Sequence, residues 1–319
     1  MSASPPPTST DRVREIAAAV RGECTPDAPM APRTSIRVGG PADLLVRPAD
    51  PPDLATLLWN CAAGRVPVMV LGGGANLLVA DAGIRGVVVR LPVDFGEESE
   101  DGERLVLSAG APVSRLVQRA ISAGLTGCEF ASGIPGTLGG AAAMNAGTRI
   151  GEMKDVVERV EVATPEGLRW IPAAGLSYAY RSSRLPPGAV VTRVGFRLRR
   201  GDPAASRAVM DADREHRRRT QPLNWPTWGS TFRNPPGDHA GRLLELAGCK
   251  GLRCGGAEVS GRHANVIVNP GEATAADVRG LAAEMAARVR ERFGVELRLE
   301  LKILDRHGRI VADPAAALA

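Results

Sequence analysis

Residues 131–147 read ASGIPGTLGGAAAMNAG, a stretch with five glycines, five alanines and no charged side chain. Such a segment has too little side-chain volume to fill a core, but its backbone N–H groups can come very close to another molecule. Pro135 and Gly136 mark a turn, and the small residues that follow can begin a helix. Backbone donors at the start of a helix bind phosphate or pyrophosphate groups. A small-residue helix packed beneath a sheet explains the same composition, so both interpretations stay open at this point.

A second glycine-rich loop, GGGAN at residues 72–76, follows the apolar run Val66–Leu71, which we predict to be a fully buried strand. In a Rossmann dinucleotide-binding unit such a loop leads into a helix. Here the chain soon enters another apolar run, Gly86–Leu91, which predicts a strand instead. The Rossmann fold is therefore excluded by context, whereas a phosphate-binding turn remains compatible with the loop.

Helices and strands alternate along the rest of the chain without a repeat, which predicts a mixed α and β fold. We expect residues 1–8 to be disordered and the turn at 201–203 to mark a domain boundary. The predicted helices are 9–21, 51–64 (capped by Asp50), 112–123, 204–219, 238–247 and 273–293, and the remaining predicted strands are 43–47, 104–109, 156–163, 168–171, 190–199, 266–268 and 295–304, with 156–171 forming a hairpin.

Composition excludes several classes of protein. The chain has 319 residues, 44% of them hydrophobic, which is typical of a globular protein. No apolar run approaches the roughly 20 residues of a membrane span, and the N-terminal MSASPPPTST lacks the pattern of a signal peptide, so we expect a cytoplasmic protein. The five cysteines and four histidines are scattered without CxxC or HExxH spacing, which predicts neither a disulfide framework nor a metal site.

The net charge of +5 suits an anionic ligand. Only three of the 40 basic residues are lysines, so arginine is a bias of the whole chain rather than a mark of one site. The segment DREHRRRT at 213–220 predicts an exposed basic helix, but aromatic residues make up only 3% of the chain and provide no platform for stacking bases. We therefore expect no nucleic-acid partner.

Sequence patterns indicate roles for three polar residues. Ser230 lies in a Pro/Gly-rich loop without a G-x-S-x-G motif, so it is either a turn serine or a hydroxyl at the rim of a pocket. Alternation along 295–304 places Glu300 on a solvated face. His263 precedes an apolar strand and is predicted to be a hydrogen-bonded structural histidine rather than a ligand.

Six stretches in chain order carry a family resemblance: VLGGGANLLV, GIPGTLGGAAAMNAG, SYAYRSS, GSTFRNP, GGAEVSGRHANVIVN and FGVELRLELKIL. From about residue 31 to 304 the chain resembles the UDP-N-acetylenolpyruvoylglucosamine reductases, FAD-dependent enzymes that make UDP-N-acetylmuramate for peptidoglycan. The resemblance implies an α+β fold with a two-part FAD-binding domain of the vanillyl-alcohol-oxidase type and a C-terminal α+β substrate-binding domain. The implied division is a tail and short helix at 1–30, the FAD-binding domain at 31–202 (subdomains 31–95 and 96–202), the substrate-binding domain at 203–306 and a tail at 307–319.

The resemblance also implies ligands. FAD would bind noncovalently, since the glycine loops hold no His or Cys that could bond to it, and NADPH would donate the hydride. The UDP-sugar would be the small-molecule substrate of a monomer without nucleic-acid or membrane partners. FAD would contact Gly72, Gly73, Gly74, Ala75, Asn76, Leu77, Gly133, Ile134, Pro135, Gly136, Gly139, Gly140 and Asn145, and the UDP-sugar would contact Tyr180, Gln221 and Asn234.

The family's catalytic residues match Arg181, Ser230 and Glu300. A fixed guanidinium such as Arg181 would stabilise the negative charge that reduction of an enolpyruvyl double bond sends toward its carboxylate. The Ser230 hydroxyl would supply a proton to the adjacent carbon, and Glu300 would lie near the same carboxylate. One subgroup of the family covers its substrate with a tyrosine-bearing insertion. This chain has no tyrosine beyond Tyr180 and a short span between Arg181 and Ser230, so it resembles the subgroup without that lid.

Two other functions remain compatible with the sequence. The first is a flavin oxidase or dehydrogenase of the same fold acting on another substrate. The second is a nonenzymatic, basic nucleotide- or nucleic-acid-binding protein. The purified protein would be yellow only if it were a flavoprotein, which separates the second alternative from the enzymes.

Overall fold

The computed structural model describes residues 9–308 and 310–311, which divide into two compact units. Unit 1 comprises the chain up to Asp27 together with Asp43–Gly73 and Gly86–Glu215, and unit 2 comprises Ala28–Ala42, Gly74–Arg85 and the chain from His216 onward. Each unit is built from separate stretches of chain, so the predicted boundaries at 30, 202 and 306 stay a prediction. The expected disorder of residues 1–8 lies outside the described residues, as do residues 309 and 312–319 of the predicted tail.

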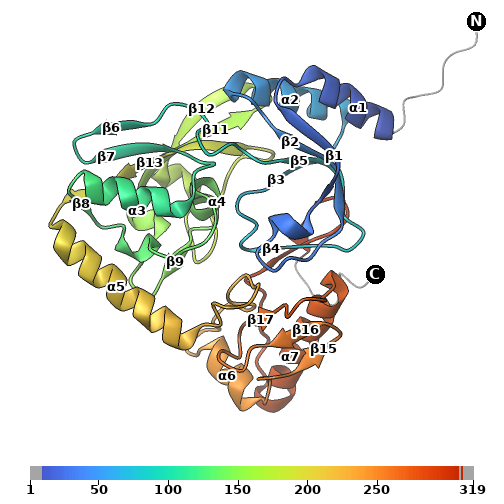
Figure 1. The fold of residues 1–319 in the computed structure, drawn as a ribbon, viewed down its shortest axis with the longest axis vertical. Coiled ribbons are helices and arrows are strands. Elements are labelled where there is room, and N and C mark those ends of the chain that lie inside the picture. Colours follow the sequence, from blue (N-terminus) through green and yellow to red (C-terminus); the bar gives the residue numbers. More distant parts are fainter. Residues whose placement is uncertain (1–8, 309, 312–319) are drawn as a thin grey trace, which may run out of the picture. The chain divides into compact units, whose positions relative to one another are not determined.

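A four-stranded sheet, most of whose residues belong to unit 1, lies beside two helices (Figure 1). Its strand order is β1-β2-β5-β3, and β3 runs parallel to β5 with no helix between them in sequence, as expected when the Rossmann fold was excluded. The predicted fully buried strand at 66–71 is wrong, because only Val68–Val70 form a strand and Val70 is 41% exposed. The elements are α1 (Ser9–Ala19, shorter than predicted), β1 (Glu23–Pro29), β2 (Pro41–Arg47), α2 (Pro51–Gly64), β3 (Val68–Val70) and β5 (Ile84–Val89).

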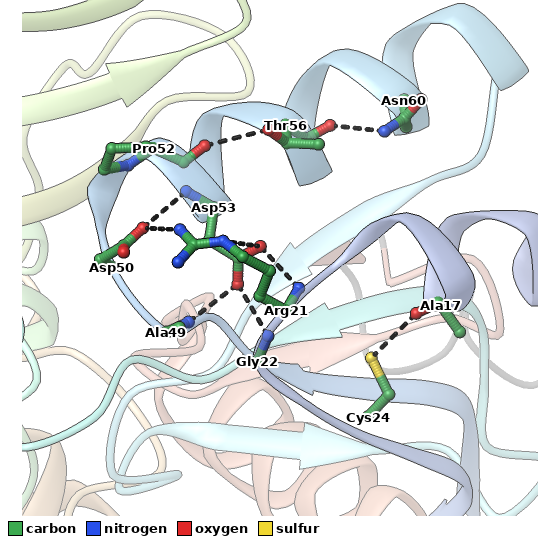
Figure 2. A network of polar contacts seen from close by, with 10 residues as sticks. All are labelled: Ala17, Arg21, Gly22, Cys24, Ala49, Asp50, Pro52, Asp53, Thr56 and Asn60. Atoms are coloured by element: carbon green, nitrogen blue, oxygen red, sulfur yellow. Dashed lines mark hydrogen bonds and ion pairs between the residues drawn. The ribbon is translucent and has the colours of Figure 1, made fainter.

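Helix α2 begins where the sequence predicted. The Asp50 carboxylate accepts a hydrogen bond from the Asp53 N–H at 2.9 Å, and Leu54, Leu57 and Leu58 are buried along one face. Figure 2 shows that Asp53 turns inward, where it is 2% exposed and accepts from the backbone N–H groups of Arg21, Gly22 and Ala49 at 2.8, 2.9 and 2.9 Å. One buried carboxylate therefore fixes the chain leaving α1 to the start of α2.

The second part of unit 1 is a five-stranded antiparallel sheet of order β12-β11-β13-β7-β6. The predicted hairpin is confirmed by the closing pair Thr164 and Gly167. Side chains of α3 and α4 share the core of this sheet, including Leu116 and Leu138. The elements are β6 (Ser99–Asp101), β7 (Arg104–Ser108), α3 (Val113–Ser122), α4 (Leu138–Ala143), β11 (Val157–Thr164), β12 (Gly167–Pro172) and β13 (Val190–Arg197), with the short pairs β8 (Leu125–Thr126) and β14 (Arg199–Arg200), and β9 (Gly147–Thr148) and β10 (Gly151–Glu152).

Unit 2 contains two three-stranded sheets and the helices α6 and α7, whose apolar side chains share one core. Thr274 caps α7 through a bond from the Asp277 N–H, and Gly294, with φ of +67°, ends it as predicted. The elements are β4 (Leu77–Val79), β18 (Lys302–Leu304) and β19 (Ile310–Val311) in one sheet, β15 (Arg253–Cys254), β16 (Ala257–Val259) and β17 (Ile267–Val268) in the other, and α6 (Ala240–Leu246) and α7 (Ala275–Phe293). The basic helix α5 (Pro203–Thr220) spans the sequence division between the units.

The predicted strand 295–304 is wrong over most of its length, because only Lys302–Leu304 are strand. From 295 to 298 half-buried and exposed residues still alternate. Leu299 then pairs with Phe232 in an isolated antiparallel bridge, and Glu300 is half-buried rather than solvated. Across residues 9–308 no helix combines the length and the apolarity that crossing a membrane requires.

Candidate active site

The two glycine loops meet inside unit 1. A Cβ atom on Gly73 would lie 2.4 Å from the Gly136 Cα, and one on Gly72 would lie 2.6 Å from the Thr137 hydroxyl oxygen. No side chain larger than hydrogen therefore fits at either position. Two segments that are far apart in sequence therefore approach each other closely at these glycines.

The structure shows the packing role for part of the stretch 131–147, and the phosphate-binding role of its turn stays a prediction. Gly139 is a packing glycine, because its N–H donates to the Ala109 carbonyl at 2.9 Å and an added Cβ would lie 2.8 Å from the Ala109 Cβ. Gly133 and Gly136 instead have φ of +81° and +106°, on an exposed or half-buried turn that precedes α4. Glycine turns of this kind let the backbone come close to an anion, so the pyrophosphate of FAD remains the predicted ligand of this loop.

The far end of the other loop belongs to unit 2, since the division falls between Gly73 and Gly74. There the Asn76 carboxamide donates to the Glu300 carbonyl at 3.1 Å, and the Lys302 N–H donates to the Asn76 carbonyl at 3.2 Å. Leu77 continues into β4, which pairs with β18 in parallel. A predicted FAD-binding residue and a predicted catalytic residue are therefore direct neighbours.

Ser230 and Glu300 are joined through the backbone of Thr231. The Glu300 N–H donates to the Thr231 carbonyl at 2.9 Å, and the Arg233 N–H donates to the Arg298 carbonyl at 2.8 Å. Both Ser230 and Glu300 are half-buried. The loop that carries the predicted proton donor and the segment that carries the predicted glutamate thus run side by side in unit 2.

Asn265 organises this pairing, although no motif identified it. It is 3% exposed, its carboxamide donates to the Phe232 carbonyl at 2.8 Å and accepts from the Phe232 N–H at 2.9 Å, and its own carbonyl accepts from the Thr231 N–H. The signal in the sequence was an asparagine next to the apolar run VIV. The Asn265 N–H donates to His263 Nδ1 at 3.2 Å, and burial lowers the pKa of His263, so the prediction of a structural histidine is confirmed.

The predicted substrate-binding residues of unit 2, Gln221 and Asn234, form hydrogen bonds within that unit. The Asn234 side-chain oxygen accepts from the Ala240 N–H at 3.1 Å, at the start of α6. The backbone carbonyl of Gln221 accepts from the Arg262 guanidinium at 3.2 Å. Asn234 is exposed and Gln221 is half-buried. Neither arrangement prevents contact with a ligand.

Arg181 lies in unit 1 at a tight turn. The N–H and carbonyl groups of Ala179 and Ser182 bond to each other, leaving Tyr180 and Arg181 at the tip. Arg181 has φ of +54°, its guanidinium donates to the Gly147 carbonyl at 2.9 Å, and it lies 5.0 Å from the centre of the Tyr180 ring. A half-buried guanidinium held in this way can stabilise a carboxylate on which charge develops.

The FAD-binding half and the C-terminal half of the chain each match a known family. Residues 42–170 match the FAD binding domain family, and residues 221–304 match the C-terminal domain of UDP-N-acetylenolpyruvoylglucosamine reductase. This second match covers the stretch that contains Ser230, Asn265 and Glu300.

Relatives match nearly the whole chain. A UDP-N-acetylenolpyruvoylglucosamine reductase of Anaeromyxobacter sp. (strain Fw109-5) is 62% identical over 93% of this chain and 94% of its own length, and that of Myxococcus xanthus is 55% identical over 86% and 90%. The crystal structure of UDP-N-acetylenolpyruvylglucosamine reductase from Thermus caldophilus is 38% identical, covers 89% of this chain and 98% of its own, and superposes with a TM-score of 0.76. On these matches, the chain belongs to the UDP-N-acetylenolpyruvoylglucosamine reductase family.

Proposed function

We propose that this protein is an FAD-dependent oxidoreductase that uses NADPH to reduce UDP-N-acetylglucosamine enolpyruvate to UDP-N-acetylmuramate, a precursor of peptidoglycan. The proposal rests on membership of the reductase family, and the structural observation that carries it is the meeting of the two glycine loops at Gly73 and Gly136. This contact creates a backbone surface suited to a dinucleotide without the Rossmann βαβ unit.

The residues that would hold FAD are the glycine loops Gly72–Leu77 and Gly133–Gly140, whose turns would bring backbone N–H groups to its pyrophosphate. Gly139, whose N–H bonds the Ala109 carbonyl, would contribute close packing rather than a donor. When bound, the cofactor supplies the two-electron chemistry that links NADPH to the enolpyruvyl double bond. The protein's part is to bind, orient and polarise the reacting groups.

Arg181 stabilises the charge that develops on the substrate carboxylate. Its guanidinium is planar, remains charged and is already held by the Gly147 carbonyl, so little reorganisation is needed as the reaction proceeds. The UDP-sugar contacts Tyr180, which is 46% exposed and lies next to Arg181. It also contacts Gln221 and Asn234 of unit 2. All of these roles are proposals for this chain.

Ser230 donates the proton that completes reduction of the double bond, and the Glu300 side chain lies near the substrate carboxylate. The support is the backbone pairing through Thr231, which fixes both segments in one piece of unit 2. A hydroxyl held by its loop can act as a general acid when it is within hydrogen-bond reach of the carbon that is protonated.

The place of action follows from the substrates. NADPH and nucleotide-activated sugars are cytoplasmic metabolites, so the protein acts in the cytoplasm, and the UDP-sugar is its partner rather than a nucleic acid or a membrane. We further propose that it works as a monomer, which sedimentation of the FAD-loaded protein measures directly.

Replacing Ser230 by alanine tests its assigned role. FAD content and reduction by NADPH should be nearly unchanged in Ser230→Ala, because neither needs the hydroxyl. Reoxidation by the enolpyruvyl substrate should slow by about 10²–10⁴-fold, the usual contribution of a positioned general acid. Ser230→Cys should retain more activity, since a thiol can still donate a proton. Rapid-mixing measurement of each half-reaction gives the answer, and equal slowing of both would remove Ser230 from the catalytic residues.

A further inference from the structure

Three hydrogen bonds tie the end of α4 to the turn that carries Arg181. The bonds start from every second residue, beginning at the end of the helix. The Ala143 carbonyl accepts from the Ser183 hydroxyl at 2.8 Å, and the Asn145 carboxamide donates to the Ala179 carbonyl at 3.0 Å. The Gly147 carbonyl accepts from the Arg181 guanidinium at 2.9 Å. All of these residues belong to unit 1. The turn 179–183 is therefore held at its base, at its functional side chain and at its exit.

The middle bond comes from a side chain with no free donor. Asn145 is 0% exposed, and its two amide hydrogens go to the Glu152 carboxylate at 2.9 Å and to the Ala179 carbonyl. Its side-chain oxygen accepts from the Lys154 N–H at 2.9 Å. A carboxamide has only two N–H donors, and both of them bond within the protein. The Asn145 side chain therefore has no donor left for a cofactor.

The backbone of Asn145 also has an unusual conformation. Asn145 has φ of +44°, a left-handed conformation that asparagine tolerates better than most residues with a side chain. This turn directs the chain from α4 to Gly147, where an added Cβ would lie 2.5 Å from the Glu152 Cβ. The conformation places the amide of Asn145 and the carbonyl of Gly147 along one edge, facing the turn.

We propose that Asn145 is the positioning residue of Arg181. It acts by bonding the Ala179 carbonyl at the base of the turn, while the Gly147 carbonyl two residues later orients the guanidinium. This inference rests on the proposed catalytic function of Arg181 and replaces a direct role of the Asn145 side chain in binding FAD. A misplacement of the order of 1 Å can cost about 100-fold in rate, so a residue that never touches the substrate can control turnover.

The experiment compares Asn145→Gly with the wild-type FAD-loaded protein. Glycine accepts the left-handed backbone but removes the carboxamide. Amide hydrogen exchange in residues 177–184 should become about tenfold faster or more, because the bond to Ala179 is lost. The enolpyruvyl half-reaction should slow by about 10–100-fold, with FAD content and reduction by NADPH retained. The double variant Asn145→Asp/Glu152→Gln, which reverses the bond between residues 145 and 152 and keeps an acceptor for the Lys154 N–H but leaves no donor for the Ala179 carbonyl, should behave alike. The matched control Asn60→Asp, on the exposed face of α2, should change none of these quantities.

A double-mutant cycle with Arg181→Lys tests whether Asn145 affects the substrate step through Arg181. If Asn145 acts through Arg181, Asn145→Gly should slow the substrate step much less in the Arg181→Lys background than in the wild type. Equal losses in both backgrounds, unchanged hydrogen exchange at 177–184, or slowing of both half-reactions together with loss of FAD would each overturn the proposal. If Arg181→Lys alone kept full turnover, the proposed function of Arg181 would fail instead, while hydrogen exchange would still report whether Asn145 holds the turn.

Discussion

At the scale of single residues, Thr231 is the centre of the pairing that joins Ser230 to Glu300. Its carbonyl accepts from the Glu300 N–H and its N–H donates to the Asn265 carbonyl. Asn265 in turn bonds both backbone groups of Phe232. Glu300 is half-buried at this pairing, where simple alternation had placed it on the solvated face.

Glu300→Gln tests whether this position is catalytic. We expect the enolpyruvyl half-reaction to slow by at least about tenfold, with reduction by NADPH unchanged, because a carboxyl group near the substrate contributes only to the second step. Glu296→Gln provides the matched control on the same segment, since Glu296 is exposed and should tolerate the change. Full turnover in Glu300→Gln would return this residue to the solvated face that simple alternation assigns to it.

His263 should make stability depend on pH. Burial lowers its pKa in the folded state below the ordinary value of about 6.5, so the unfolded chain binds the proton more readily. The contribution of His263 is therefore complete above about pH 6.5 and is lost as the pH falls toward the folded pKa. Urea unfolding of the wild type and of His263→Gln at pH 8 and pH 5 measures this, and the advantage of the wild type should shrink at the lower pH. A difference that stays constant between the two pH values would refute it.

Sequence reasoning assigned some of these residues better than others. The structural role of His263 was predicted from its place before an apolar strand. The role of Asn265 was not, because its place beside the apolar run VIV does not reveal the two backbone partners at Phe232, which are more than 30 positions away. The misplacement of Glu300 has the same origin, since the bond to Thr231 joins residues almost 70 positions apart.

At the scale of elements, local signals located helices more accurately than strands. Asp50 marked the start of α2 and Gly294 the end of α7, through a bond or a backbone conformation formed within a few residues, whereas the Thr274 cap of α7 was not predicted. The strand predicted at 295–304 failed because the segment pairs with a loop through one bridge and becomes a strand only beside β4. Strand β6 was missed because it is an exposed, acidic edge strand, SED at 99–101.

The start of α2 gives a prediction at this scale. Asp53→Ala should lower the free energy of unfolding by about 2–3 kcal/mol, because three partly buried backbone N–H groups lose the buried carboxylate that they share as an acceptor. Asp211→Ala, which breaks an exposed pair with Arg214 on α5, should cost about 0.5 kcal/mol or less. Urea denaturation monitored by circular dichroism provides both values. Equal, small losses would mean that Asp53 does not hold the junction of α1 and α2.

At the scale of the whole molecule, the fold class was within reach of the sequence, but the interleaving of the two units was not. The chain passes between the units four times before residue 90, because short strands on either side of the Gly72–Asn76 loop belong to different units. A single linear boundary cannot describe such a chain. The family resemblance, by contrast, needs only the order of six motifs, and relatives at 62% identity confirm it.

The central claim is a reaction in two steps joined by one cofactor. The measurement is anaerobic: the FAD-loaded protein is first reduced with NADPH, and the enolpyruvyl UDP-sugar is then added while flavin absorbance is recorded. The account predicts bleaching of the flavin by NADPH and return of its absorbance only with the enolpyruvyl substrate, yielding UDP-N-acetylmuramate in equal amount to the flavin. UDP-N-acetylglucosamine, which lacks the enolpyruvyl group, should leave the flavin reduced. Failure of the enolpyruvyl substrate to restore the absorbance, or equal reoxidation by both sugars, would contradict the claim.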